Sequence, residues 1–400
     1  MGQPLLPLDD LRILDLTHYY NGPYATFLLS HLGAEVIKVE APEFGDGGRA
    51  LFRRKGNPYG TPFALLNSNK QSITLNLKSA EGQALFKRLV RTADIVVENY
   101  AAGTMDSMGL GYEILRAENP RLIYATSTGF GLSGPYRDVA AFDPIIQAMA
   151  GVMAITGEAD GPPMKTAAAV ADILGGVHLC AGLLAAIRQR DRTGVGLMVE
   201  LCLYDSVIPA LTSFLGAMGM GLTNLRDGNR ASGGAISPYN AYPASDGWVM
   251  ILAGDNLRWK KMCDLMGRPE LASDERFAAA GARARNLQEV DQIVAAWTRT
   301  KTRRELFDIM AAADVFCGIV QDLPEVMADK HLLARGMLRE VDHPALGPMT
   351  IFTSPLRLDS EAPVPISMSP ALGESNERIY RDELGLTPEE IAALRDRKII

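Results

Sequence analysis

Short β-rich runs alternate with helical segments through the first half of the chain, and this alternation is the feature that most restricts its fold. The runs lie at Arg12–Leu16, Glu35–Glu40, Ile73–Leu77, Asp94–Asn99 and Leu122–Ser127. Neighbouring parallel strands need a crossover connection long enough for a helix, and each interval between these runs provides one. The alternation therefore predicts an α/β fold with a mainly parallel sheet that binds ligands at the carboxyl ends of its strands.

The loop after the first run contains His18–Pro23 and leads into a helical pattern over Tyr24–Leu32, at the sheet edge where ligands bind. A dinucleotide-binding fold would carry G-x-G-x-x-G in this turn, whereas Tyr20–Ala25 contains one glycine. We therefore do not expect a nicotinamide dehydrogenase. Glu40 closes the second run, and we expect it to be a strand-end carboxylate that faces water.

A compositional break divides the chain near residue 220. Gly, Asn and Met are frequent over Gly216–Gly234, and domain boundaries fall in segments of this kind. We expect a large domain with an N-terminal part at 1–220 and a C-terminal part at 331–400. A smaller inserted α+β domain at 221–330 would contain the glycine-rich segment and the linkers.

Charge and apolar patterning favour a small-molecule partner. The chain has 40 Lys and Arg against 47 Asp and Glu, a net charge of −7 without blocks of like charge, which argues against nucleic acid or a membrane as a partner. The N-terminus lacks the basic start of a signal peptide, so we expect a cytoplasmic protein. The longest apolar run, Ile173–Ile187, is shorter than the ~20 residues of a membrane-spanning helix, and we expect a core helix.

Residue spacing gives no support for metal or disulfide chemistry. The 4 cysteines (Cys180, Cys202, Cys263 and Cys317) lie far apart, mostly in apolar segments, which is typical of buried thiols. The 5 histidines form no H-x-x-x-H pair. We therefore expect no metal site and no permanently bound cofactor.

Asp172 precedes the long apolar run directly, at the expected start of a helix. An acid here is usually an N-cap, which contributes about 1 kcal/mol. The position also suits a nucleophile, because the helix dipole and free backbone N–H groups would keep the carboxylate ionised, and a carboxylate can attack an acyl carbonyl to form an anhydride. Gly175 and Gly176 would let a bulky ligand approach the backbone. Position alone leaves both interpretations open.

The glycine-rich run Gly228–Gly234 also has two interpretations. A run of this composition between domains is commonly a flexible linker. It can equally be a mobile flap, containing Gly228, Gly233 and Gly234, that shields a reactive acyl intermediate from water.

Six short blocks, in order, resemble the class III CoA-transferases, the family that includes formyl-CoA transferase and carnitine CoA-transferase. They are Leu14–Thr17 with Gly22–Pro23, Gly33–Glu40, Asn69–Ile73 with Leu77–Lys78, Val97–Tyr100, Gly129–Gly131 with Gly134–Pro135, and Ala171–Asp172. Gly228–Gly234, Asp246–Gly247 and Gly373–Glu374 extend the resemblance over nearly the whole chain. It implies a nucleotide-binding-like large domain, a small inserted domain and a homodimer of interlocked chains.

The resemblance also implies the reaction and its residues. CoA would pass from an acyl-CoA donor, such as succinyl-CoA or acetyl-CoA, to a small carboxylic acid through a covalent aspartyl intermediate. Asp172 matches the aspartate that reacts in this family. The positions that match its CoA contacts are Tyr19, Asn21, Lys78, Asn99, Tyr100, Gly129 and Phe130.

Two departures from the family pattern concern CoA and the flap. Ser107 stands where the family often has Arg or Lys, so the 3′-phosphate of CoA needs another partner, for which Arg53 and Arg54 are candidates. Ala231 and Ser232 make the flap less uniformly glycine than in the oxalate and formate branch.

Two alternative functions stay open. The racemase branch of the superfamily also resembles this chain, which makes a 2-methylacyl-CoA racemase one alternative. That branch uses the His of a Gly-His-Asp block as a proton carrier, whereas Phe142 stands here and cannot exchange a proton. We expect Asp143, in the same block, to be a structural cap or turn acid. The other alternative is a non-catalytic acyl-CoA-binding protein of the same fold.

The acid that receives CoA is not fixed by any motif. The polar side chains that could serve a second carboxylate are Tyr19, Tyr20, Tyr24 and Arg53. They favour a dicarboxylate such as succinate, glutarate, itaconate or mesaconate.

Overall fold

The structure is a computed structural model that describes residues 6–53, 57, 59–223, 225–358 and 366–400. The chain forms two compact units. Unit 1 comprises Met1–Met149, Ala167–Pro209 and Asp329–Ile400, and unit 2 comprises Ala150–Thr166 and Ala210–Ala328. Unit 1 therefore takes segments from both ends of the chain.

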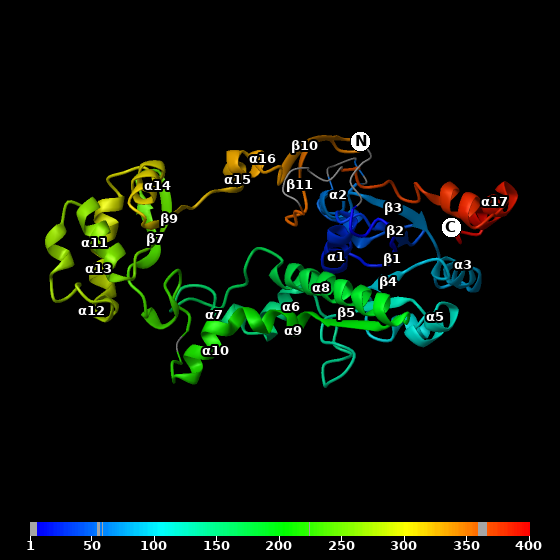
Figure 1. Cartoon of the computed structure of the whole chain (residues 1–400), viewed down its shortest axis with the longest axis horizontal. Coiled ribbons are helices and arrows are strands. Elements are labelled where there is room, and N and C mark those ends of the chain that lie inside the picture. Colours follow the sequence, from blue (N-terminus) through cyan, green and yellow to red (C-terminus); the bar gives the residue numbers. More distant parts are fainter. Residues whose placement is uncertain (1–5, 54–56, 58, 224, 359–365) are drawn as a thin grey trace. The chain divides into compact units, whose positions relative to one another are not determined.

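Unit 1 contains a six-stranded parallel sheet in the order β3-β2-β1-β4-β5-β6 (Figure 1). The strands are β1 (Arg12–Asp15), β2 (Glu35–Glu40), β3 (Lys70–Thr74), β4 (Ile95–Glu98), β5 (Ile123–Thr128) and β6 (Met198–Cys202). The predicted α/β fold with a parallel sheet is confirmed. Because the strand order changes direction between β1 and β4, ligands are expected at the carboxyl ends of these two strands.

Successive side chains of each strand point to opposite faces of the sheet, so unit 1 has two apolar cores. Ile13 and Val97 lie in the core shared with helices α1 (Asn21–Ser30) and α8 (Val170–Thr193). Leu14 and Val96 lie in the other core, whose helices are α3 (Ala80–Val90), α5 (Tyr112–Glu118) and α17 (Pro388–Asp396).

The remaining elements of unit 1 are short. They are η1 (Gly47–Ala50), α2 (Thr61–Leu66), α4 (Thr104–Ser107), α6 (Asp143–Met149), α9 (Leu203–Val207), α16 (Lys330–Ala334), the hairpin of β10 (Leu338–His343) and β11 (Gly347–Phe352), and η5 (Glu377–Glu383). Buried residues of η5 and α17, Tyr380 and Ile391 among them, complete the core that begins with the N-terminal strands.

Helix α8 is longer than the sequence suggested. It has 24 residues, and by length and composition it is the one helix in the described ranges that could cross a membrane, with 44% of its most apolar window buried in the structure. The side with Leu179 and Leu183 is buried, whereas Ile173, Val177 and Leu184 are exposed. The expected core helix is therefore buried along one side.

Unit 2 contains a three-stranded antiparallel sheet in the order β7-β8-β9, made of β7 (Tyr239–Ala244), β8 (Gly247–Leu252) and β9 (Phe316–Ile319). Trp259 and Tyr242 are the largest side chains of its core. Its helices are α7 (Val152–Ile155), α10 (Thr212–Gly219), α11 (Asn256–Leu265), α12 (Ala280–Arg285), α13 (Leu287–Thr298), α14 (Arg303–Ala312) and α15 (Leu323–Met327), with short turns η3 (Ser232–Gly234) and η4 (Pro269–Ala272).

Candidate active site

Asp172 is the third residue of α8 and lies in its first turn. The N-cap is Ala169, whose side chain forms no capping hydrogen bond. The expected N-cap role of Asp172 is therefore wrong. The helix begins three residues earlier than an N-cap at Asp172 requires, because the acceptor for its first N–H groups comes from another helix.

Asp143, the first residue of α6, provides that acceptor. Its Oδ2 accepts hydrogen bonds from the backbone N–H groups of Ala171, at 2.7 Å, and Asp172, at 3.2 Å. These are the second and third N–H groups of α8, the ones that an N-cap side chain ordinarily serves. The expected role of Asp143 as a structural cap is confirmed.

Asn21, at the start of α1, forms a second hydrogen bond to the main chain of Asp172. Its Nδ2 donates to the main-chain oxygen of Asp172 at 3.2 Å, and its Oδ1 accepts from Oγ of Ser127, in β5, at 2.6 Å. Asn21 is only 3% exposed. The main chain of Asp172 is thus bonded on both sides by buried polar side chains.

Burial and the neighbouring Asp143 charge raise the pKa of Asp172 to about 7. The expectation that the helix terminus favours the ionised form is wrong, because burial and the charge of Asp143 outweigh that effect. The nearest N–H groups are bonded to Asp143, whose negative charge opposes a second one. A carboxylate that ionises only near neutral pH is more basic, and so a stronger nucleophile, than an ordinary aspartate.

Gly175 and Gly176 serve helix packing. A Cβ on Gly175 would lie 2.4 Å from Nδ2 of Asn21, and one on Gly176 would lie 2.8 Å from the main-chain oxygen of Asn21. The expectation that these glycines admit a ligand is therefore wrong. They let α1 approach α8 closely enough for Asn21 to reach Asp172.

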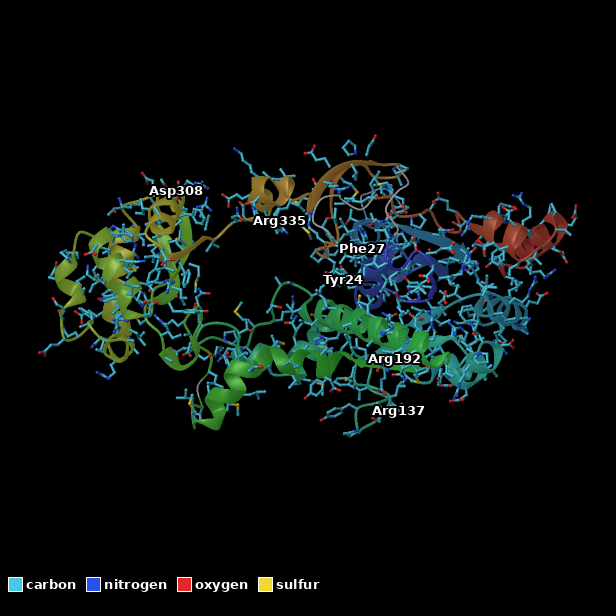
Figure 2. All side chains as sticks on the ribbon, viewed as in Figure 1. Tyr24, Phe27, Arg137, Arg192, Asp308 and Arg335 are labelled. Carbon is cyan, nitrogen blue, oxygen red and sulfur yellow. The ribbon has the colours of Figure 1, made fainter. Side chains whose placement is uncertain are left out.

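Three tyrosines, two in the loop after β1 and one in α1, have different environments. Tyr20 is the N-cap residue of α1, and burial together with the Asp172 charge raises the pKa of its phenol. Tyr19 has a left-handed backbone, with φ of 67°, and its N–H donates to Oδ1 of Asp46 at 2.9 Å. Tyr24 stacks on Phe27 along α1 with ring centroids 6.0 Å apart (Figure 2). Tyr20 is therefore the one of these three tyrosines whose pKa the charge of Asp172 raises.

Asn99 and Tyr100 follow β4 and contact the same loop. Asn99 accepts from the N–H of His18 at 2.8 Å and donates to its carbonyl at 2.9 Å. The ring of Tyr100 lies 5.6 Å from that of His18. The carboxyl ends of β1 and β4 are thus joined through His18.

Gly129 and Phe130 follow β5. The carbonyl of Gly129 accepts from the N–H of Tyr204 at 3.0 Å, and a Cβ on Gly129 would lie 2.6 Å from that of Ala141. The buried ring of Phe130 contacts Tyr204 and Tyr136, with centroids 5.6 and 5.5 Å away. This loop passes close to the residues that precede α6.

The basic residues considered for CoA are less constrained. Lys78 is exposed after β3, Arg53 donates to the carbonyl of Ala50, and Arg54 lies outside the described residues. Arg137, in the loop after β5, is a basic residue that the sequence analysis did not single out (Figure 2). Its guanidinium lies 3.7 Å from a Cβ built on Gly103, the residue that precedes α4 and Ser107.

A buried ion network lies beneath the loop after β1. Lys38 donates to the carbonyl of Thr17 at 2.6 Å and pairs with Asp46 at 2.9 Å. Lys70 pairs with Asp15 at 3.0 Å, and both side chains are inaccessible to solvent. Burial opposes the ionisation of Asp15, but the charges of Lys38 and Lys70 outweigh it and lower the pKa of Asp15.

Glu40 belongs to the same buried region. Its carboxylate pairs with Nε of Arg49 at 2.7 Å and accepts from Oγ of Ser72 at 2.6 Å. Glu40 is 2% exposed, so the expectation that it faces water is wrong. The sequence could not identify Arg49 as its partner, because η1 brings Arg49 to the end of β2 only in the folded chain.

The Gly228–Gly234 segment belongs to unit 2 and has a defined conformation. Gly228, Gly233 and Gly234 have φ of 62°, 68° and 65°, a region that favours glycine. The N–H of Gly233 donates to Asp227 at 2.6 Å. The glycines are thus required by the turn itself.

The described residues contain no group of three or more His, Cys, Asp or Glu side chains that could bind a metal ion. All 4 cysteines are free thiols, of which Cys180 and Cys263 are buried, as expected, while Cys202 and Cys317 are half-buried.

Comparison with known proteins identifies the family. The model of CoA-transferase family III matches residues 8–376. The chain is 38% identical to the succinyl-CoA–D-citramalate CoA-transferase of Chloroflexus aurantiacus, over 100% of this chain and 99% of the relative. It is 37% identical to the formyl-CoA:oxalate CoA-transferase of Streptomyces coelicolor, over 98% of this chain and 99% of the relative.

A solved structure agrees with these relatives. The crystal structure of a CAIB/BAIF family protein from Brucella suis matches with a TM-score of 0.83 and 35% identity, covering 94% of this chain and 99% of that chain. The resemblance seen in the short sequence blocks is confirmed. The chain belongs to CoA-transferase family III and is a CoA-transferase.

Proposed function

We propose that this enzyme transfers CoA from an acyl-CoA donor to a small dicarboxylic acid through a covalent intermediate on Asp172. One observation carries the proposal: Asp172 has a carboxyl group of raised pKa, about 7, on a main chain bonded to Asp143 and Asn21. This combination gives a basic carboxylate in a fixed position, which covalent catalysis requires.

The proposed reaction conserves the thioester bond. The Asp172 carboxylate attacks the donor carbonyl, CoA leaves as a thiolate, and a mixed anhydride forms. The thiolate then attacks the aspartyl carbonyl, which releases the donor acid and leaves an aspartyl-CoA thioester. The acceptor carboxylate attacks that thioester and releases CoA thiolate, which attacks the acceptor carbonyl of the new anhydride. The products are acceptor-CoA and free Asp172.

CoA is proposed to bind along the carboxyl ends of β1, β4 and β5. Backbone groups of the loops after β1 and β5 and the side chain of Tyr100 would contact it, with Lys78 near its phosphates. Arg137 is added as a candidate for the 3′-phosphate, because it lies beside Gly103, the residue that precedes α4, where Ser107 supplies no charge. Arg binds phosphate through several donors at once.

A dicarboxylate acceptor is supported by chemistry beside Asp172 and by the relatives. The phenol of Tyr20 is close enough for the Asp172 charge to raise its pKa, so a neutral hydroxyl is available to donate to a second carboxylate. The names of both relatives include dicarboxylic acids: succinate and citramalate in one, and oxalate in the other.

The test is a screen of free acids against succinyl-CoA and acetyl-CoA with isotopic label in the acid. Incorporation of label into acyl-CoA supports transfer, and the best acceptor identifies the acid. Exchange of the α-proton with solvent, without label transfer, would indicate the racemase alternative instead. Saturable CoA binding with neither reaction would indicate a binding protein.

The glycine-rich segment is proposed to act as a flap over the acyl intermediate. Val at both Gly233 and Gly234 places β-branched residues at φ of 68° and 65°, which forces another conformation on the segment. We expect slower transfer or faster hydrolysis of acyl-CoA, with little change in thermal unfolding. Gly267→Val is the matched control, since Gly267 has φ of 67° in a different turn of unit 2. Equal rates in both variants would make the segment a linker.

The enzyme is further proposed to be an obligate cytoplasmic homodimer of interlocked chains. Exposed Ile173, Val177 and Leu184 lie on one side of α8, and exposed apolar sides of this kind are usually covered in an assembly. We expect sedimentation equilibrium to give twice the 43.2 kDa chain mass down to nanomolar concentration. A folded monomer under those conditions would contradict the proposal.

A further inference from the structure

We propose that Asp143 is a positioning residue of the transfer reaction, whose carboxylate both fixes the main chain of Asp172 and opposes its negative charge until Asp172 is acylated. This inference rests on the proposed role of Asp172 as the nucleophile. It gives α6 a part in catalysis, although Asp143 lies 29 residues from Asp172 in the sequence and belongs to a different helix.

The carboxyl group of Asp143 is buried and bonded to three N–H donors. This residue is 8% exposed and accepts from the N–H groups of Ala171 and Asp172 and from Nε2 of Gln147. Each partner is an N–H donor, so nothing around the carboxyl group requires a proton on it. Asp143 therefore places a buried carboxylate beside the proposed nucleophile, and its charge is one of the causes of the raised pKa of Asp172.

Helix α6 is bonded to the start of α8 at several points. Gln147, one turn further along α6, is fully buried and also lies 3.4 Å from the carbonyl of Ala168. Helix α6 thus contacts the start of α8 at Ala168, Ala171 and Asp172. A shift of α6 would carry the nucleophile with it, and displacements of about 1 Å cost ~10²-fold in rate.

The side chain that caps α8 carries a negative charge, which a cap does not need. Ser or Asn at the N-cap position would serve the same N–H groups without a charge, yet the chain has Ala169 there and an anion from α6. A second carboxylate beside an anion is disfavoured, which is the second cause of the raised pKa of Asp172 after burial. A helix cap alone does not explain this charge.

In the described part of the chain, no Lys, Arg or His forms an ion pair with Asp143 or Asp172. The titratable groups on the elements packed against α8 are Tyr20 at the N-cap of α1, Tyr24 of α1, Tyr124 of β5, Glu200 and Cys202 of β6, and Tyr204 and Asp205 of α9. Of these, Tyr20 is the group whose pKa the charge of Asp172 raises.

The negative charge of Asp143 affects the attack of Asp172 on the thioester. When the carboxylate of Asp172 attacks the thioester carbonyl, its negative charge moves to the carbonyl oxygen and then leaves with the CoA thiolate. Repulsion by Asp143 is therefore present before the reaction and is relieved as the C–O bond forms. An interaction that favours the transition state over the ground state raises turnover.

The test compares Asp143→Asn with the wild type in kcat/KM measured from pH 5 to 9. Asn keeps one acceptor for the α8 N–H groups but removes the charge. We expect the acidic limb to move to lower pH by ~1 unit and turnover at pH 8 to fall ~10-fold or more. Asp205→Asn, at an exposed acid on α9, is the control and should keep both values. An unshifted limb in a folded Asp143→Asn enzyme would overturn the inference.

Two further measurements keep the outcomes separate. Trapping with hydroxylamine and acyl-CoA reports a hydroxamate at Asp172 in the wild type; if none forms, the proposed function fails, whatever Asp143 does. If Asp143→Asn does not fold, Asp143→Glu takes its place. It keeps the charge and displaces the main chain, so it should lose turnover while its acidic limb stays at the wild-type pH. Wild-type turnover in Asp143→Glu would contradict the inference.

Discussion

Asp172→Asn is expected to lower the rate of CoA transfer by at least ~10³-fold and to make the protein more stable at pH 8. The loss of transfer has a simple cause, because the amide cannot attack the donor thioester. Asp172→Glu should lose at least ~10³-fold too, since it keeps the charge but moves it by one methylene group, and small displacements of a reacting group already cost ~10².

The gain in stability comes from the raised pKa. A carboxyl group with a pKa of about 7 in the folded protein binds more protons there than in the unfolded chain between about pH 4 and 7. Stability contributed by this group therefore falls as the pH rises through that interval and stays low above it. Removing the charge should return about 2 kcal/mol at pH 8, because the carboxyl group keeps part of its contact with water.

The measurement is the free energy of unfolding of both proteins at pH 5 and pH 8, at one protein concentration. The difference in favour of Asp172→Asn should be larger at pH 8. Near wild-type turnover in this variant would eliminate Asp172 as the nucleophile. If Asp172→Asn is less stable than the wild type at pH 8, the surroundings stabilise the carboxylate of Asp172, which contradicts its raised pKa.

Asp15→Asn is expected to destabilise the protein by about 3–5 kcal/mol, the usual cost of removing one member of a buried ion pair. Lys70 pairs with Asp15 at 3.0 Å, and burial already lowers the pKa of Lys70 to about 8. Without the carboxylate, its ammonium group loses its closest anion. Because the pKa of Asp15 is lowered, its contribution is complete above pH 4 and is lost only as the pH falls below that value.

Chemical unfolding at pH 7 measures this effect. Asp10→Asn is the matched control, because Asp10 is exposed two residues before β1 and the same change should cost less than ~0.5 kcal/mol there. Equal stability of the two variants would show that the network contributes no more than a surface charge. Transfer should also fall in Asp15→Asn, since Lys38 and Lys70 lie beneath the loop that contains His18 and Tyr20.

The parallel sheet was predictable because apolar strands and amphipathic helices alternate along the chain. The error at β3 has a physical reason. The sequence favours Ile73–Leu77, whereas the strand is Lys70–Thr74, and Lys70 and Ser72 are buried within it. Charged residues inside a strand indicate a solvent-facing position until their partners are known. Those partners, Asp15 and Glu40, lie on other strands.

At the candidate site, too, contacts between residues far apart in the sequence could not be predicted. The resemblance pointed to Asp172, and the order of the motifs was enough for that. The sequence predicted a cap role for Asp143 but not that it caps α8, because Asp143 is 29 residues from Asp172 and reaches α8 only after α6 has packed. Local rules assign a cap to the nearest polar residue, and here that residue was Asp172 itself.

The division of unit 1 between the two ends of the chain has a consequence for synthesis on the ribosome. The core on the α3 side of the sheet lacks Ile379, Tyr380, Ile391 and Leu394 until the last part of the chain has emerged. Strands β1 to β6 must therefore wait with that apolar face only partly covered, by α3 and α5, while the main stretch of unit 2 is made. Unit 2 lies almost entirely in one stretch, Ala210–Ala328, and can fold first, so the exposed face of the unfinished sheet is the surface that chaperones would have to protect.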